Sequence, residues 1–107
     1  MKKQLKNSIA FVGGDVNFKM GDWNKTFIPG NKIQFEVSSK MPIKNVTYCW
    51  NNGKKIKVRA KKDHCIFEAK MPKGDNNFPT IFIEVNVKLP TGICTQYGRF
   101  FQINNVY

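Results

Sequence analysis

The segment KKIKVRAKK, residues 54–62, has the composition and spacing of a site for an anionic ligand. In a strand, its alternate cations from Lys55 to Lys61 would project on one side about 6.6 to 7 Å apart, close to the phosphate repeat of a nucleic-acid strand or another polyanion. Outward lysines also protect edge strands from aggregation, so a solvated sheet edge is the competing interpretation. We call residues 54–62 the basic segment; its cations are Lys54, Lys55, Lys57, Arg59, Lys61 and Lys62.

Other residues could reinforce the basic segment once the chain has folded. Lys44, Lys70 and Lys73 lie near the ends of other expected strands, which could pack beside it. Recognition of a single-stranded nucleic acid would also need exposed aromatic rings on which bases stack. The possible exposed aromatic residues are Phe82, Phe100, Trp23 and Tyr97, and none is adjacent to the segment in sequence. For this reason we rank nucleic acid below an acidic protein or an anionic surface as the partner.

A separate candidate is the turn GDWNKT, residues 21–26. Trp23 could stack on a sugar ring while Asp22 and Asn24 hydrogen-bond its hydroxyl groups, as in a carbohydrate-binding module. We favour the other interpretation, in which Trp23 belongs to an edge strand and covers the core.

Residues with catalytic or metal-binding chemistry are few. His64 is the only histidine, and it precedes Cys65, but neighbouring strand residues point to opposite faces and cannot form a catalytic pair. The three cysteines lack the spacing of a zinc site: we expect Cys65 to fill the core, Cys49 to be half-exposed and Cys94 to lie in a turn. The acidic residues form no pair, and Gly13-Gly14 is not followed by the residues of a phosphate-binding loop. The sequence therefore predicts no enzymatic activity, metal or cofactor.

Length and charge define the class of protein and of partner. A chain of 107 residues with 41% hydrophobic residues is one domain's worth of sequence. Eighteen Lys and Arg residues against seven Asp and Glu residues give a formal net charge of +11, which favours acidic partners. An acidic protein, an anionic polymer and nucleic acid all fit, and no transmembrane segment is expected.

Cysteine usage and the first residues bear on the compartment. An odd number of cysteines favours free thiols and thus the cytoplasm. The apolar stretch from Ile9 to Val12 is too short for a signal peptide. An extracellular or virion surface is the alternative, if the chain is a module of a longer protein. Localisation and redox state stay open on this basis.

Alternating hydrophobicity predicts an all-β chain. Residues 31–39, 45–53, 65–74, 79–92 and 95–104 alternate apolar and polar side chains between turn residues, and the basic segment does so with Ile56, Val58 and Ala60 inward. Residues 8–30 are expected to form one bent or split edge strand with its bend at Gly13-Gly14. No window has helical periodicity. The expectation is an antiparallel β-sandwich of about seven strands.

Four patterns carry a resemblance to a known class of module. The stretches V-x-Y-x-W-N-N-G, F-x-A-x-M-P-x-G, I-x-I-x-V-x-V-x-x-x-T-G and F-x-I, within residues 30–104, resemble bacterial immunoglobulin-like and fibronectin-like modules. The resemblance implies a single Ig-like domain over residues 1–107, with residues 1–8 as a basic tail that can be disordered, and Trp50 as the core Trp. Such modules, in bacterial and phage proteins, are usually non-catalytic units for binding or spacing. Apolar residues stand where an inter-sheet disulfide would lie.

Together these patterns predict a non-enzymatic interaction module that binds an acidic protein or an anionic surface through the basic segment. One alternative is a small intracellular or phage-encoded protein that binds nucleic acid or inhibits by covering a nucleic-acid path. A second alternative is a carbohydrate-binding module that uses Trp23. The chain would be a monomer or a dimer through a sheet edge. The natural ligand is not specified by these patterns.

Overall fold

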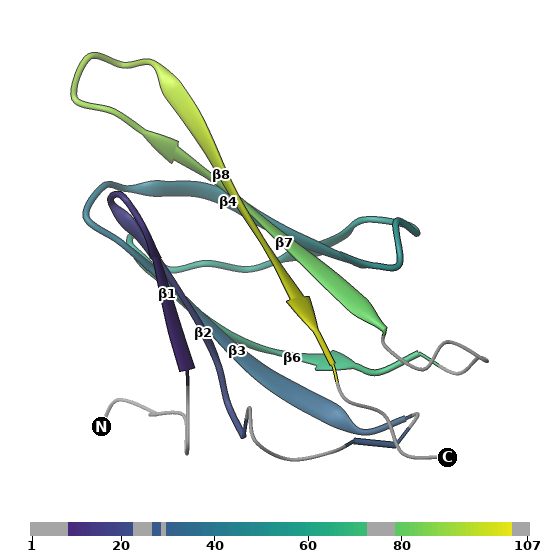
Figure 1. Cartoon of the computed structure of the whole chain (residues 1–107). Coiled ribbons are helices and arrows are strands. Elements are labelled where there is room, and N and C mark those ends of the chain that lie inside the picture. Colours follow the sequence, from purple (N-terminus) through teal and green to yellow (C-terminus); the bar gives the residue numbers. More distant parts are fainter. Residues whose placement is uncertain (1–8, 23–26, 29, 73–78, 104–107) are drawn as a thin grey trace.

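The computed structural model describes residues 9–22, 27–28, 30–72 and 79–103, which form an all-β sandwich (Figure 1). Two four-stranded antiparallel sheets pack together, and these residues contain no helix, hence none suited to crossing a membrane. The strands are β1 (Ile9–Gly13), β2 (Val16–Met20), β3 (Lys32–Ser39), β4 (Ile43–Trp50), β5 (Ile56–Val58), β6 (His64–Lys70), β7 (Thr80–Lys88) and β8 (Cys94–Gln102). The expected all-β antiparallel sandwich is confirmed, and the expected edge segment is split into the hairpin β1–β2.

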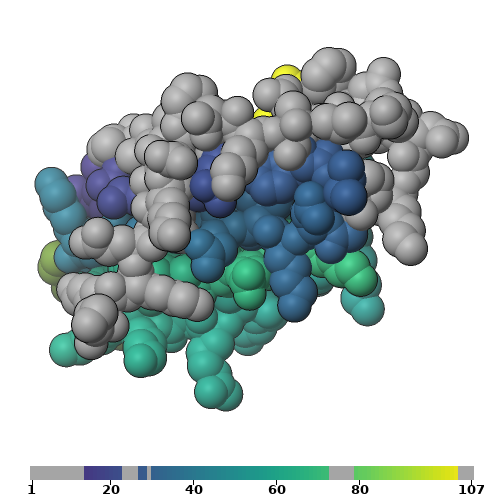
Figure 2. Space-filling view, turned by 90° about the horizontal axis from the view of Figure 1, so that it is seen from below, coloured from purple at the N-terminus to yellow at the C-terminus, as the bar shows by residue number. Residues whose placement is uncertain are grey.

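The chain passes between the two sheets several times. The first sheet has the order β1-β2-β3-β6, and the second has the order β5-β4-β7-β8. After β3 the chain crosses to β4 and β5, returns to β6, and crosses again to β7 and β8. In the view from below, β3 runs across the underside in blue, and teal side chains from the middle of the chain project along the lower rim (Figure 2). In the order of the second sheet β5 is an outermost strand, so the part of the basic segment that it contains lies at a sheet edge.

The core lies between the inward faces of the two sheets. Period-2 alternation directs Ile33, Phe35 and Val37 of β3 inward, and all three are buried. On β7 the inward residues from Ile81 to Val87 are buried in the same cluster. The Phe35 ring lies 5.6 Å from the Phe67 ring and 5.5 Å from the Phe101 ring, centroid to centroid. The core is thus apolar, and the three cysteines are free thiols.

A tight reversal connects β4 to the basic segment. Asn51 and Asn52 have φ angles of 50° and 60°, which asparagine tolerates better than other residues with a side chain. The Gly53 amide donates a hydrogen bond to the Trp50 carbonyl at 2.8 Å and closes the turn. The sequence Asn-Asn-Gly therefore turns the chain back beside β4.

Several side chains do not lie where the sequence predicted. Only residues 56–58 of the basic segment form a strand. Ile56 lies opposite the inward Tyr48 but is 45% exposed, because β5 is the edge strand of its sheet. Cys49 is 6% exposed rather than half-exposed, with Phe82 of β7 directly opposite it on the ladder. Trp50 is half-buried and packs against the core from its rim. The expected basic tail, residues 1–8, lies outside the described residues.

Candidate anion-binding face

The outward surface of the second sheet brings together residues from all four of its strands. In an antiparallel ladder, directly opposite residues share a face. Lys57 is opposite Thr47, Thr47 is opposite Glu84, and Glu84 is opposite Gly98, so one row crosses β5, β4, β7 and β8. The next row contains Cys49, Phe82 and Phe100. We call this surface the outer face.

Three cations surround one cavity at the β5 edge of the outer face. Lys44, Lys57 and Arg59 are exposed and line a cavity of 370 Å³, together with Asn45, Val58 and Ala60. A register shift between Ile43 and Asn45 places Lys44 at an irregularity of β4, where the pairing with β7 is interrupted. We call Lys44, Lys57 and Arg59 the basic corner. No carboxylate is among the described residues that line this cavity.

The acidic group on the outer face is already neutralised. Glu84 is the only acidic residue in the four strands of the second sheet, and it is 8% exposed. Its carboxylate accepts hydrogen bonds from Lys55 Nζ at 2.9 Å and from Gln96 Nε2. The hydrogen bond and the negative charge of Glu84 raise the pKa of Lys55. Lys55 is therefore paired with Glu84, whereas no carboxylate lines the cavity of the basic corner in the part of the chain that the structure describes.

The basic segment is consequently not the continuous row of cations that its alternation predicted. Lys55 contacts Glu84, and Lys57 and Arg59 belong to the basic corner. Arg59 also borders, with Lys61, a cavity toward β6 of the first sheet. The reason is that β5 ends at Val58 and the chain turns near Lys62, whose φ is 39°, into β6. Lys54, Lys61 and Lys62 are exposed.

Of the two reinforcing lysines that the structure describes, Lys44 lies beside the segment and Lys70 does not. Lys70 ends β6 in the other sheet, and Lys73 lies outside the described residues. The contribution of Lys44 depends on β4 pairing with β5, which the sequence suggested only through the Asn-Asn-Gly turn.

An aromatic pair occupies the other end of the outer face. The centroids of Phe82 and Phe100 are 4.2 Å apart, with 33° between the ring planes. Phe100 is 58% exposed, while Phe82 is half-buried over Gly98: a Cβ added at Gly98 would lie 2.5 Å from Phe82 Cζ. We call Phe82 and Phe100 the aromatic shelf. A cavity of 330 Å³ adjoins it, lined by Asn51, Asn52, Thr80, Phe82 and Phe100.

The other two aromatic candidates do not join this shelf. Tyr97 is half-buried and packs against the core, because it lies opposite the inward Val85. Trp23, with the proposed glycan site, lies outside the described residues. The outward position of Phe82 and Phe100 was visible in their alternation, whereas their contact required the pairing of β7 with β8.

The outward face of the first sheet carries the histidine. His64 Nε2 pairs with the Glu36 carboxylate, and Ser38 lies directly opposite His64 without a hydrogen bond to it in the described part of the chain. Cys65 faces the core, where its thiol donates to the Arg59 carbonyl at 3.3 Å and burial raises its pKa to about 11. A thiol with that pKa is a poor nucleophile at neutral pH.

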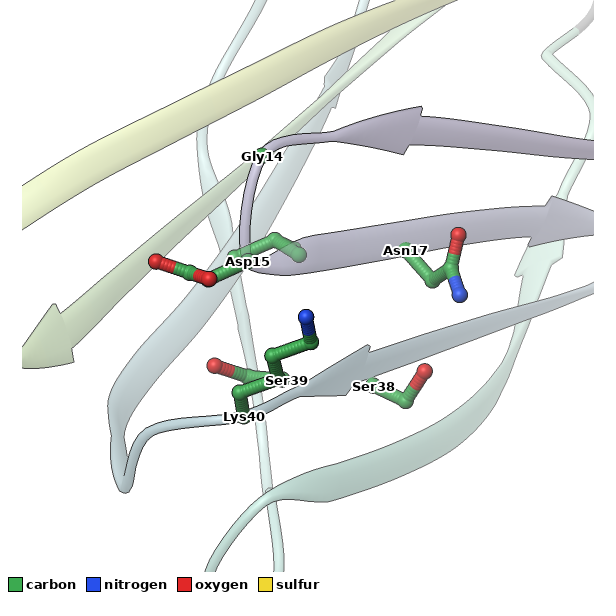
Figure 3. Close-up of a pocket in the computed structure, with 7 residues that line it drawn as sticks. Gly14, Asp15, Asn17, Ser38, Ser39 and Lys40 are labelled. Carbon is green, nitrogen blue, oxygen red and sulfur yellow. The ribbon is translucent and has the colours of Figure 1, made fainter.

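A third cavity, of 220 Å³, lies between the β1–β2 turn and the end of β3 (Figure 3). Its lining has both charge signs, with the Asp15 carboxylate and the Lys40 ammonium beside the hydroxyls of Ser38 and Ser39. It lacks the uniform positive charge of the basic corner. Among residues 9–22, 27–28, 30–72 and 79–103, no group of His, Cys, Asp and Glu is arranged to hold a metal ion.

Comparison of the chain with protein-family models, with curated proteins and with solved structures gives no match. The functional assignment therefore depends on the geometry of the outer face.

Proposed function

We propose that this protein is a non-enzymatic binding module that holds an anionic partner, an acidic protein or polymer, at the basic corner. The observation that carries the proposal is the grouping of Lys44, Lys57 and Arg59 around one cavity on a face whose only strand carboxylate is paired with Lys55. Three exposed like charges around one space repel one another. A bound anion would relieve that repulsion, so the folded protein presents an attractive site for negative charge.

The net charge of the chain acts in the same direction. With a formal charge of +11, the protein attracts polyanions from a distance, and the attraction weakens as salt screens it. If the three cations of the basic corner each contact one phosphate of a single strand, the slope of log affinity against log salt should be about −2, at roughly 0.7 per contact. The predicted binding is therefore strongly dependent on ionic strength.

The order of the strands supports a module of the immunoglobulin-like class. In such domains strand C pairs with strand F, which pairs with strand G, while strands A, B and E pair in the other sheet. Here β4, β7 and β8 are joined in that way, β5 extends the sheet beside β4, and β2, β3 and β6 form the other group. By this correspondence β4 would be strand C and Trp50, which is half-buried against the core, would be its Trp. This class supplies rigid surfaces for binding, with no requirement for catalysis.

Charge reversal with a matched control tests the proposal. The corner variant combines Lys44→Glu, Lys57→Glu and Arg59→Glu. The control variant combines Lys32→Glu, Lys40→Glu and Lys70→Glu, which are exposed outside the second sheet. Both variants lower the net charge by six, so long-range attraction is weakened equally.

Binding of fluorescent polyphosphate, polyglutamate and an oligonucleotide would be followed by anisotropy at low and moderate salt, after circular dichroism has shown that both variants are folded. The corner variant should lose binding to at least one of these polyanions, while the control variant retains most of it. Equal losses in the two variants would show that only net charge matters and would refute a defined site.

A further inference from the structure

The aromatic shelf supplies a surface that a purely electrostatic site does not need. Phe100 is 58% exposed, so much of its side chain is open to a partner. Its ring is supported by Phe82, which is itself confined over the Gly98 backbone. A flat ring held in one position is suited to stack on another planar group at low entropic cost.

Hydrogen-bonding groups and cations lie on either side of this ring. The 330 Å³ cavity beside Phe100 is bordered by the exposed Asn52 and by Thr80, and amide and hydroxyl groups of this kind recognise the edges of unpaired bases. The basic corner lies at the opposite edge of the sheet: Phe100 on β8 is three strands from Lys57 on β5, about 14 Å across the sheet, and the row of Lys57 is two residues further along the strands, so the two are about 16 Å apart. A short extended strand of a polymer could reach both.

The surface between the two ends is neutral or polar. Glu84 is held by Lys55 and Gln96, and the Asn86 side chain donates to Asn45 Oδ1 at 2.7 Å. A negatively charged backbone that crosses this area therefore meets no uncompensated carboxylate from the strands beneath it.

We infer that the anionic partner is a single-stranded nucleic acid, with a base stacked on Phe100 and the backbone phosphates at Lys44, Lys57 and Arg59. The inference rests on the proposed function, since it needs the basic corner to bind anions. It adds a planar component, because a single strand of several nucleotides carries both unpaired bases that can stack on a ring and phosphates that can reach the cations of the same face. A duplex keeps its bases stacked inside, and the Asp and Glu side chains of an acidic peptide carry no aromatic ring.

The test separates the base from the phosphate. Binding of the full chain to an oligothymidylate would be compared with binding to an abasic oligonucleotide of the same length, which keeps the phosphates and lacks the bases. Wild type should bind the oligothymidylate about tenfold tighter, the gain typical of a stacked base. Phe100→Ala should abolish that preference and leave abasic binding unchanged, whereas Phe100→Trp should keep it.

A matched control is Ile93→Ala. This residue is 64% exposed in the turn between β7 and β8, so its truncation removes exposed apolar surface away from the aromatic shelf. It should leave the preference intact. Equal affinity of wild type for the two oligonucleotides would overturn the nucleic-acid inference and leave the proposed function in place. Tighter binding of a matched duplex or of polyglutamate than of the oligothymidylate would have the same consequence. Absence of binding to every polyanion would overturn both.

Discussion

Replacing Gly98 by Ala tests whether the aromatic shelf is held as described. The new Cβ would lie 2.5 Å from Cζ and 2.8 Å from Cε1 of Phe82, whereas carbon atoms in favourable contact are about 3.5 to 4.0 Å apart. The ring must therefore move by roughly 1 Å. Because this ring supports Phe100 and lies opposite the buried Cys49, its displacement disturbs the whole aromatic shelf.

The expected free-energy change has two opposing parts. Forcing a methyl group into a packed site costs about 1 to 3 kcal/mol, and part of that cost is the lost contact between Phe82 and Phe100. Replacing a strand glycine by Ala returns about 0.5 to 1 kcal/mol. We expect Gly98→Ala to lower the free energy of unfolding by about 1 kcal/mol in the wild-type background.

The Phe82→Ala background reverses the sign of this effect. The three atoms nearest to the new methyl group all belong to the Phe82 ring, so with the ring absent Gly98→Ala should stabilise by about 0.5 to 1 kcal/mol. The coupling energy in a double-mutant cycle should thus be about 1 to 3 kcal/mol. Urea denaturation of the four proteins, followed by tryptophan fluorescence, measures it. If Gly98→Ala had the same effect in both backgrounds, Phe82 would not lie over Gly98 and the rigid shelf would be wrong.

Three further predictions concern the paired carboxylate, the core and the buried thiol. Glu84→Gln frees Lys55, so the salt slope for a single-stranded polyanion should steepen by about 0.7, one further contact; an unchanged slope in anisotropy titrations would contradict a free Lys55. Phe35→Ala empties the centre of the core and should cost about 3 to 5 kcal/mol in urea denaturation, and a cost below about 1 kcal/mol would show that the sheets do not pack on this ring. Burial raises the pKa of Cys65 from 9.0 to about 11, so stability that depends on the neutral thiol is complete below pH 9.0 and is lost as the pH rises to about 11. Across that range wild type should lose on the order of 2 kcal/mol more than Cys65→Ala, and parallel pH profiles would refute this.

The strand faces of the core could be predicted from local pattern alone. Alternation at Ile33, Phe35 and Val37 identified the inward side of β3 because the period of two is a property of the strand backbone. The same pattern identified Phe82 and Glu84 as outward residues of β7. These predictions needed no knowledge of neighbouring strands.

Burial at the edge and on the outer face could not be predicted in this way. Ile56 has the inward phase of β5 and is nevertheless exposed. The burial of an inward residue on an edge strand depends on whether the opposite sheet extends far enough to cover it. Cys49 has the outward phase of β4 and is nevertheless buried, with Phe82 beside it. Both outcomes depend on residues distant in sequence.

The amino-acid sequence specified an all-β sandwich, its core faces and a concentration of positive charge in residues 54–62, because composition and alternation act locally. The grouping of Lys44 with Lys57 and Arg59, the pairing of Lys55 with Glu84, and the position of Phe82 and Phe100 on the same face follow from the registers of β4 with β5 and of β7 with β4 and β8. Those registers are set by which strands pair across long stretches of chain, and a single-strand pattern carries no information about its partners.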